Sequence, residues 1–307
     1  MRLIRGFAGG GTHASGCIVT VGTFDGIHLG HQALIGRVSE HAKRLRLPAA
    51  LLTFEPMPRE YLQPDAPPAR LTSFRERWRI LSSQPLDYLC LLRFGEALRN
   101  LTPEAFAERL ARELRARVVV VGDDFRFGRR GEGTVPMLEG YGRRLGFEVD
   151  TVAPVMSRAE RISSGAVRKA LASADFARAR EWLGRAWSMR GRVMAGNRLG
   201  HELGFPTANL PLERRRAPVG GIFAVWVYGV GSGVLPGVAS LGTRPTVGGG
   251  EALLEAHLFD FGGDLYGREI EVEFAAKLRE EERFPSLDAL VAQMQRDALD
   301  ARRILNV

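Results

Sequence analysis

The chain has 307 residues, of which 45% are hydrophobic and 25% are charged, and its formal net charge is +8. The length suits two domains of average size, and the composition is that of a globular protein rather than of a disordered chain. No apolar run is long enough for a signal peptide or a membrane span, so we expect a cytoplasmic protein. The positive charge fits nucleic acid, anionic membranes and phosphorylated small molecules equally and does not choose among them.

The two cysteines bear on the compartment as well. Cys17 and Cys90 both lie in apolar runs that are typical of strands. Disulfides are rare in proteins that stay in a reducing compartment, and we find no export signal in this sequence. We therefore expect two buried free thiols rather than a disulfide.

Strand-like and helix-like segments alternate over residues 1–184. Four consecutive β-branched residues, Val118–Val121, suit a strand that is covered on both faces, as in a parallel sheet. The alternation predicts an α/β domain with a doubly wound parallel sheet. We expect strands at 17–22, 49–54, 88–94, 117–122 and 147–155, and helices at 29–45, from residue 102 and at 164–183.

The pattern changes after residue 184. Short β-rich runs there are separated by Gly and Pro at close intervals, which predicts a small antiparallel barrel or sandwich over residues 185–307. Apolar residues at helical spacing predict a C-terminal helix that begins near Ser286. The expected strands lie at 189–193, 222–229, 237–241, 253–259 and 269–274.

Glycines, an aspartate and two histidines occupy the junction between the predicted strand at 17–22 and the predicted helix at 29–45. A helix N-terminus offers free amides to an anion, and parallel sheets bind ligands at their carboxyl edge. His28 and His31 are three residues apart, so both could donate hydrogen bonds to a phosphoryl group. Two surface histidines and a zinc pair are the alternatives, although no nearby carboxylates or cysteines complete a zinc site. The other predicted binding residues here are Gly22, Phe24, Asp25 and Gly30.

Two further segments could complete this nucleotide site. In the loop after the valine-rich strand, Phe125 and Phe127 could flank a planar ring, and Arg126 could meet phosphate. A polar loop with two buried aromatic rings is the alternative. Ser164 opens a predicted helix, and Arg168 follows one turn later. An N-cap is the default role of such a serine, and the presence of Arg168 makes the segment a candidate triphosphate site.

A second group of polar residues lies in the β-rich half. Thr207 and Asn209 are two apart in an extended segment, so their oxygens share a face and suit a Mg²⁺ ion that also holds ATP. Glu255 alternates with apolar residues in a predicted strand and could accept the proton of an attacking hydroxyl. A solvent-facing glutamate is the alternative. The glycines of a predicted phosphate loop before Thr207 include Gly191, Gly196 and Gly200.

Together these motifs resemble the bifunctional bacterial riboflavin kinase/FAD synthetase family. They follow the order of the family over nearly the whole chain. The resemblance implies a nucleotidyltransferase-type α/β domain followed by a six-stranded riboflavin kinase barrel. It rests on residues 22–31, 53–56, 122–128, 162–164, 204–209, 242–246, 255–257 and 264–268.

The resemblance also implies the chemistry and the roles of the residues. Riboflavin would be phosphorylated to FMN, and FMN would then be adenylylated to FAD with release of pyrophosphate, using ATP and Mg²⁺ in both steps. Riboflavin, FMN, FAD and ATP would be the partners, with no nucleic acid, no membrane and at most a transient homo-oligomer. His28 and His31 would stabilise the α-phosphoryl group, and Glu255 would be the general base of the kinase. Further implied binding residues are Asp124, Ser164, Arg168, Thr207, Asn209 and Arg244.

The sequence departs from the family pattern at three positions. Met57 and Ala195 stand where the family commonly has His, and Gly165 replaces a usual Thr. Three other interpretations stay open. They are a related nucleotidyltransferase with another substrate, a nucleic-acid-binding protein with a basic barrel, and a regulatory protein that binds FMN without making FAD.

Overall fold

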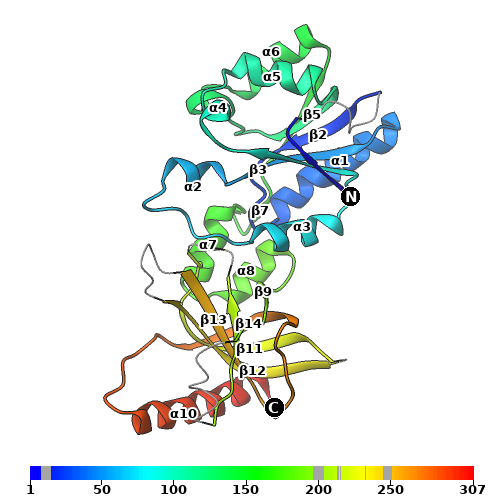
Figure 1. The fold of residues 1–307 in the computed structure, drawn as a ribbon. Helices are drawn as coiled ribbons and strands as arrows, with labels where there is room; N and C mark the ends of the chain where they lie inside the picture. The colour runs from blue at the N-terminus through cyan, green and yellow to red at the C-terminus, as the bar shows by residue number, and fades with distance from the viewer. Residues whose placement is uncertain (8–14, 196–203, 213, 215, 232, 245–250) are drawn as a thin grey trace. The chain divides into compact units, whose positions relative to one another are not determined.

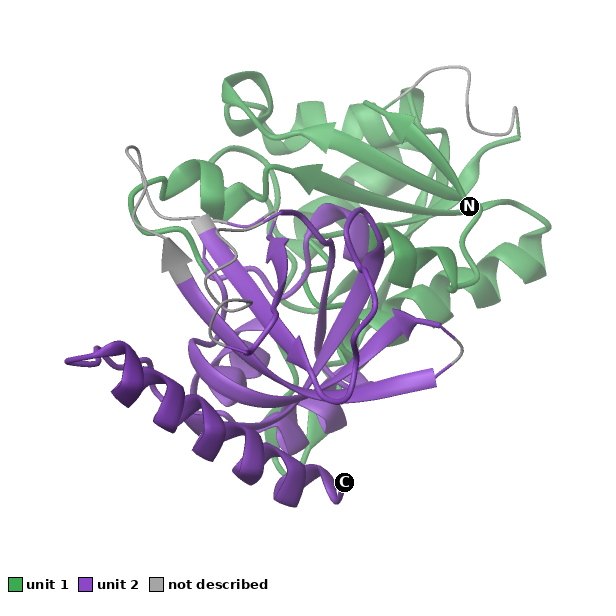
Figure 2. Ribbon diagram, turned by 60° about the horizontal axis from the view of Figure 1, so that its bottom comes forward, with its two compact units in different colours: residues 1–68, 77–163 green, residues 69–76, 164–307 purple. Residues whose placement is uncertain are grey.

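The computed structural model describes residues 1–7, 15–195, 204–212, 214, 216–231, 233–244 and 251–307. These residues form two compact units (Figure 2), which we name the sheet unit and the barrel unit. The sheet unit comprises Met1–Pro68 and Arg77–Ser163, and the barrel unit comprises Ala69–Glu76 and Ser164–Val307. Each unit has its own six-stranded sheet.

The sheet unit is built on parallel strands (Figure 1). They are β1 (Arg2–Arg5), β2 (Cys17–Val21), β3 (Ala49–Glu55), β4 (Tyr88–Arg93), β5 (Ala116–Gly122) and β6 (Glu148–Val152). Their order is β1-β4-β3-β2-β5-β6, so the chain moves outward from β2 and then returns to its other side to add β5. Open sheets bind ligands beyond the carboxyl ends of the strands where the order reverses, which here is between β2 and β5.

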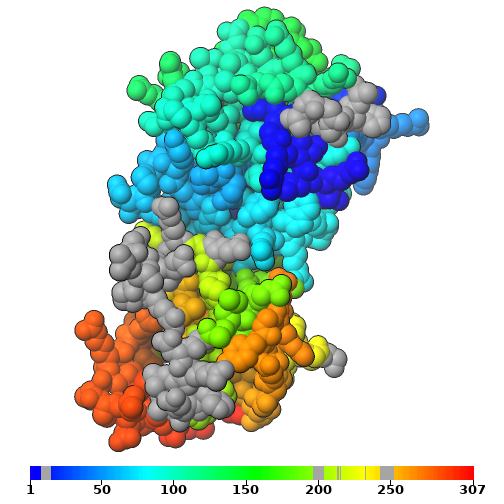
Figure 3. All heavy atoms as spheres, viewed as in Figure 1, coloured from blue at the N-terminus to red at the C-terminus, as the bar shows by residue number. Residues whose placement is uncertain are grey.

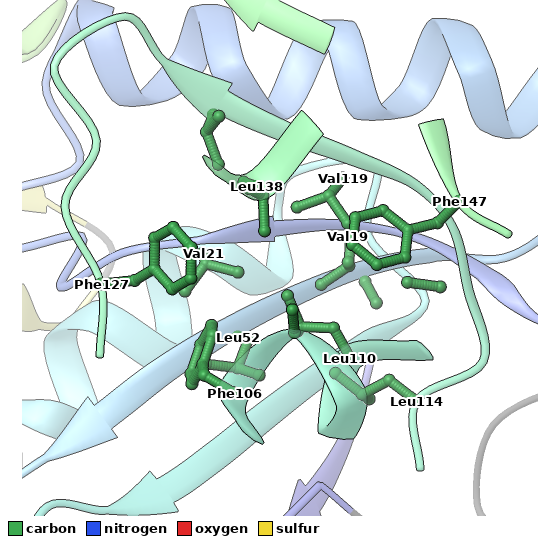
Figure 4. Packing of buried hydrophobic residues seen from close by; sticks show 14 of the residues in the cluster. Val19, Val21, Leu52, Phe106, Leu110, Leu114, Val119, Phe127, Leu138 and Phe147 are labelled. Atoms are coloured by element: carbon green, nitrogen blue, oxygen red, sulfur yellow. The ribbon is translucent and has the colours of Figure 1, made fainter. Parts of the chain in front are cut away.

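Helices cover both faces of this sheet, which confirms the doubly wound prediction. Helix α1 (Leu29–Leu45) packs against β2, β3 and β5. On the other face, α5 (Pro103–Arg112) and α6 (Val135–Leu145) form a core with alternate residues of the strands (Figure 4). The start of α5 is as predicted, because the Thr102 hydroxyl accepts a hydrogen bond from the Ala105 N–H at 3.2 Å.

The remaining elements of the sheet unit are short. Helix α3 (Phe74–Ser82) is shared, because Glu76 is grouped with the barrel unit and Arg77 with the sheet unit. The others are α2 (Pro58–Leu62), α4 (Glu96–Arg99), a 3-10 turn at Arg129–Gly131, and the strand pair β7 (Met156–Ser157) and β8 (Glu160–Arg161).

The barrel unit contains six antiparallel strands. They are β9 (Ser188–Arg192), β10 (Ala208–Pro211), β11 (Gly221–Val230), β12 (Gly233–Arg244), β13 (Glu251–Leu258) and β14 (Glu269–Arg279). They pair in the order β10-β13-β12-β11-β14-β9. A β-bridge between Met194, just after β9, and Asn209 in β10 joins the two ends of this order. The sheet is therefore a nearly closed barrel rather than a sandwich.

The predicted C-terminal helix is present as α10 (Leu287–Leu305). The Ser286 hydroxyl caps it by accepting a hydrogen bond from the Ala289 N–H at 3.2 Å. Ala301 and Leu305 pack on the outer side of the barrel, whereas Leu299 is 64% exposed where α10 lies at the surface (Figure 3). Among the described residues, every helix is too short or too polar to cross a bilayer.

The single helix expected over residues 164–183 is wrong. The segment forms two helices, α7 (Ser164–Ala172) and α8 (Phe176–Leu183). Ala174 between them has a φ of 57°, which a helix cannot contain, and Asp175 caps α8 by accepting from the Arg178 N–H at 2.9 Å.

The boundary between the two compact units lies earlier in the chain than residue 184, where the composition changes. Helices α7 and α8 are grouped with the barrel, and the division falls between Ser163 and Ser164. The reason is aromatic packing, because the Phe176 ring of α8 lies 6.1 Å from that of Phe274 and 6.0 Å from that of Phe223 in the barrel. The folding boundary at residue 184 stays a prediction.

Both thiols are free and buried, as expected, and we predict that they are unreactive in the folded chain. Burial raises the pKa of Cys17 and of Cys90 from 9.0 to about 12, and the Cys17 thiol donates to the Leu114 carbonyl. At pH 8 a thiol-specific disulfide reagent should label neither cysteine until denaturant is added. Rapid labelling of the native chain would contradict this burial.

The same shift gives a pH dependence of stability. Because folding favours the protonated thiol, this contribution is fully present below pH 9.0 and is lost as the pH rises towards about 12. Replacing both cysteines by Ala or Ser should flatten this part of the alkaline stability profile, measured by denaturant unfolding.

Candidate active sites

The loop between β2 and α1, residues 22–28, has a backbone that most residues avoid. Phe24 and Ile27 have φ of 50° and 42°, in the left-handed region that disfavours bulky and β-branched side chains. Both side chains are fully buried, and Asp25 between them is 1% exposed. Such strain persists only where the surrounding structure holds it, and it gathers at functional sites.

His28 and His31 lie against each other at the start of α1. Their rings are stacked, with 3.7 Å between the centroids and 20° between the planes. His28 is the N-cap of the helix, since its Nδ1 accepts a hydrogen bond from the His31 N–H at 3.3 Å. Because Nδ1 is an acceptor, the proton of a neutral His28 lies on Nε2, which can donate to an anion at the helix N-terminus.

Gly30 allows the chain to lie close to these rings. A Cβ at position 30 would be 3.1 Å from the His28 ring and 3.5 Å from the Ile162 carbonyl oxygen. Gly22 continues from β2 and donates its N–H to the Leu52 carbonyl at 3.1 Å. The loop and the first turn of α1 together bring the predicted residues to the carboxyl edge of the sheet. They are Gly22, Phe24, Asp25 and His28 in the loop, and Gly30 and His31 in α1.

The loop after β5 lies at the same edge, because β5 pairs in parallel with β2. The Asp124 carboxylate forms an ion pair of 2.8 Å with Arg161, and this hydrogen bond raises the pKa of the Arg161 guanidinium. The Phe125 and Phe127 rings stack 5.6 Å apart, but Phe127 is only 5% exposed and belongs to the core. Phe125 is half-buried and Arg126 is exposed, so they are the more accessible members of the loop. Their roles towards a ligand stay predictions.

Arg161 contacts the predicted site residue Asp124, although the sequence alone predicts no role for Arg161. It lies in β8, far along the chain from its partner Asp124, so no local pattern connects the two. Its place just before Ile162 and Ser164, inside a predicted motif, is the signal that could have identified it.

Ser164 and Arg168 lie in the first two turns of α7, in the barrel unit, and both are half-buried. Arg168 Nε donates to the Ala69 carbonyl oxygen at 2.6 Å within that unit. Ile162, two residues before Ser164, contributes the carbonyl oxygen beside Gly30. A role of Ser164 and Arg168 towards a triphosphate stays a prediction.

In the barrel unit, strand register brings the second polar group together. Asn209 in β10 lies directly opposite Glu255 in β13, and Ser240 in β12 is the neighbour of Glu255 on its other side. Directly opposite residues of antiparallel strands share a face, so these side chains form one row. Leu254 is fully buried inside the barrel and Glu255 is half-buried, which confirms the predicted alternation. The row therefore lies on the outer face of the barrel wall.

Thr207 and Asn209 line a pocket of about 410 Å³ together with the loop 261–266. Asn209 Oδ1 is buried and accepts no hydrogen bond from the described part of the chain. An amide oxygen in this state fits a cation that prefers hard oxygen ligands, as Mg²⁺ does. Among the described residues, no group of three or more His, Cys, Asp or Glu is arranged to hold a metal ion.

The other predicted residues of this site are only partly described. Gly191 lies in β9, where a Cβ would be 3.3 Å from Leu210. The backbone of Arg244 pairs with Glu251 between β12 and β13, and its side chain lies outside the described structure. Gly196 and Gly200 lie outside the described residues.

Comparison with known proteins divides the chain in two. A family model described as FAD synthetase matches residues 11–166, and one described as riboflavin kinase matches residues 183–305. The first match covers β2, β5 and the two loops that follow them, which carry His28 and Asp124. The second covers the whole barrel and its row of polar residues.

Similar proteins match over the full length. The chain is 44% identical to a bifunctional riboflavin kinase/FMN adenylyltransferase of Escherichia coli (strain K12), covering 100% of this chain and 99% of the relative. It is 40% identical to one of Haemophilus influenzae, covering 100% of both chains. A solved Streptococcus pneumoniae structure described as a macrolide-efflux protein is 32% identical, with a TM-score of 0.80 over 96% of this chain and 97% of the other.

The unsatisfied oxygen of Asn209 gives a prediction about stability. Asn209→Leu removes the buried unsatisfied oxygen, but it also removes the hydrogen bond from Asn209 Nδ2 to the Thr207 carbonyl at 3.3 Å. These effects oppose each other, so the unfolding free energy of the free protein should change by only about 1 kcal/mol. If Asn209 holds Mg²⁺ together with ATP, we expect these ligands to raise the unfolding temperature of the barrel unit in the wild-type chain, and we expect this rise to disappear in Asn209→Leu. An unchanged rise in the variant would remove Asn209 from the predicted metal site.

Proposed function

Because the chain belongs to the family of bifunctional riboflavin kinase/FMN adenylyltransferases, we propose that each of its two reactions runs at one of the two sites described above. The chain phosphorylates riboflavin to FMN with ATP, and it transfers an adenylyl group from ATP to FMN, giving FAD and pyrophosphate. We assign phosphorylation to the barrel unit and adenylyl transfer to the sheet unit. The pairing of Asn209 with Glu255 on one face carries the kinase assignment, because it joins a metal ligand to a base.

In the kinase, Glu255 is the proposed general base. Its carboxylate takes the proton of the ribityl 5′-hydroxyl, whose oxygen bonds to the γ-phosphorus of ATP while the bond to the bridging oxygen breaks and ADP leaves. Glu255 and Asn209 are direct cross-strand neighbours, so the base and the phosphate end of ATP would meet on the same stretch of wall. No covalent enzyme intermediate is needed, and positioning carries the catalysis.

Both activities use ATP, which kinases and nucleotidyltransferases typically bind with a divalent metal. We propose Mg²⁺ in the kinase site, held by the Thr207 hydroxyl and the Asn209 Oδ1. When bound, the ion neutralises charge on the ATP phosphates. The buried position of the Asn209 amide supports this role, since its oxygen cannot be satisfied by bulk water.

In the adenylyltransferase, His28 and His31 are proposed to stabilise the reacting α-phosphoryl group. A phosphate oxygen of FMN bonds to the α-phosphorus, and the bond between that phosphorus and the pyrophosphate oxygen breaks. The Nε2–H of His28 would donate to a non-bridging oxygen as its charge grows, beside the N-terminal amides of α1. Asp124, Phe125 and Arg126 would contact FMN or ATP from the neighbouring loop.

We also propose that the chain acts in the cytoplasm on these small molecules alone, without nucleic acid or membrane and at most as a transient homo-oligomer. The two free thiols support a reducing compartment. The positive net charge of +8 is compatible with substrates that carry phosphate groups, although it does not by itself select them.

Glu255→Ala should lower the turnover of riboflavin phosphorylation by about 10²-fold or more, because the hydroxyl then lacks a base. Glu255→Gln keeps the size of the side chain and should be equally slow. The control is FAD formation from supplied FMN, which both variants should retain. Wild-type turnover of riboflavin by either variant would exclude Glu255 as the base.

The double variant His28→Ala with His31→Ala should lower FAD formation by about 10²- to 10³-fold while FMN still accumulates from riboflavin. His28→Asn separates capping from catalysis, since Asn can cap α1 but lacks the Nε2–H donor. We expect His28→Asn to unfold at the wild-type temperature and to be slow in adenylyl transfer. If FMN and FAD formation fell together in these variants, the assignment of two sites would be wrong.

A further inference from the structure

A buried guanidinium lies behind the strained loop of the sheet unit. Arg77 in α3 is 0% exposed and is among the largest fully buried side chains of the described chain. Its Nη1 donates to the Thr23 carbonyl oxygen at 2.7 Å. Its Nη2 donates to Glu55 Oε2 at 2.7 Å and to the Phe54 carbonyl oxygen at 3.3 Å. One side chain therefore joins the end of β3 to the loop that carries the two histidines.

The Thr23 carbonyl is held from two sides. Besides Arg77, the Thr53 hydroxyl donates to it at 3.1 Å. Thr23 directly precedes Phe24, the first residue of the loop with a positive φ. A fixed carbonyl fixes the peptide plane between Thr23 and Phe24, and so limits the dihedral angles that Phe24 can adopt.

Two neutral hydrogen bonds contribute to holding the other end of the loop. Gln32 Nε2 donates to the Ile27 carbonyl oxygen at 3.0 Å, and the His31 N–H donates to His28 Nδ1 at 3.3 Å. The bond from Arg77 to the Thr23 carbonyl is charge-assisted and, at 2.7 Å, shorter than these two, so it is expected to restrain the loop more strongly than either of them. Its removal should let Phe24 and Ile27 relax towards ordinary dihedral angles, which would move the histidine rings.

We propose that Arg77 is a positioning residue for adenylyl transfer, which holds the loop between β2 and α1 in the conformation that presents His28 and His31 to the phosphoryl group. This inference rests on the proposed assignment of that reaction to the sheet unit. A core alone does not call for a charge here, since apolar side chains of similar volume fill buried space without desolvating an ion. The guanidinium supplies directed donors to a carbonyl and a carboxylate that an apolar side chain cannot supply.

The fold should tolerate the loss of this group. Without Arg77 the Thr23 carbonyl keeps its bond from Thr53, and the Glu55 side chain, which is 30% exposed, can be solvated. Arg77→Met fills most of the space without donors. Arg77→Lys keeps the charge and can bond to part of the acceptors. The matched control is Arg79→Met, because Arg79 lies in the same helix but is exposed.

The test measures kcat and KM for FAD formation from FMN and ATP, together with riboflavin phosphorylation and thermal unfolding, in all three variants. Arg77→Met should lower kcat for FAD formation by about 10²-fold with KM for FMN and ATP within a few-fold, as expected for misplaced groups. Arg77→Lys should regain about tenfold of that loss. Phosphorylation should stay near wild type in every variant, and Arg79→Met should match wild type throughout.

Two results would overturn the inference. One is a folded Arg77→Met with wild-type kcat for FAD formation. The other is an Arg77→Met whose lost FAD formation is wholly explained by unfolding of the sheet unit at the assay temperature and returns on cooling. Both results differ from the one that would disprove the proposed adenylyltransferase site. In that case the His28 and His31 variants would still form FAD at the wild-type rate.

Discussion

Hydrogen bonding between neighbouring strands decides which polar side chains of this chain can act together. In the sheet unit, β2 pairs in parallel with β5. This pairing places the loop between β2 and α1, which leads to His28, and the loop after β5, which contains Asp124, at the same edge of the sheet. In the barrel unit, the antiparallel register sets Asn209 opposite Glu255. A shift of one residue in that register would turn Asn209 to the opposite face and separate the two groups. Both proposed sites therefore depend on register more than on any single contact.

Much of this organisation could be predicted from the sequence, because its signals are local. The valine run, the glycine-rich junctions and the alternation around Glu255 each lie within one short segment, and they specify strands, loops and faces directly. The βαβ order then predicts a parallel sheet, whose topology brings the loops together.

What could not be predicted depends on contacts between distant segments. The break at Ala174 follows from packing of α8 on the barrel, which outweighs the helical spacing of residues 164–183. The sequence left open whether Phe127 contacts a ligand or is buried, and the tertiary packing places its ring in the core. Arg77 sits in a helix among exposed arginines, and only the tertiary structure distinguishes it by burial and by its acceptors.

Each unit contains local features that by themselves lower the free energy of unfolding. The sheet unit holds Phe24 and Ile27 at positive φ and buries a guanidinium behind them. The barrel unit leaves the Asn209 amide oxygen buried with no donor from the described residues. Local departures of this kind are expected where a chain must bind phosphate and metal, since the ligand completes what the protein leaves open.

The most direct test of two separable sites is complementation between variants. A chain with Glu255→Ala and a chain with His28→Ala and His31→Ala are each incubated alone with riboflavin, ATP and Mg²⁺, and then mixed. Each chain alone should make FAD only slowly, whereas the mixture should make it much faster, because FMN released by one chain is adenylylated by the other. A mixture that forms FMN but no FAD, although the Glu255→Ala chain converts supplied FMN, would contradict this account.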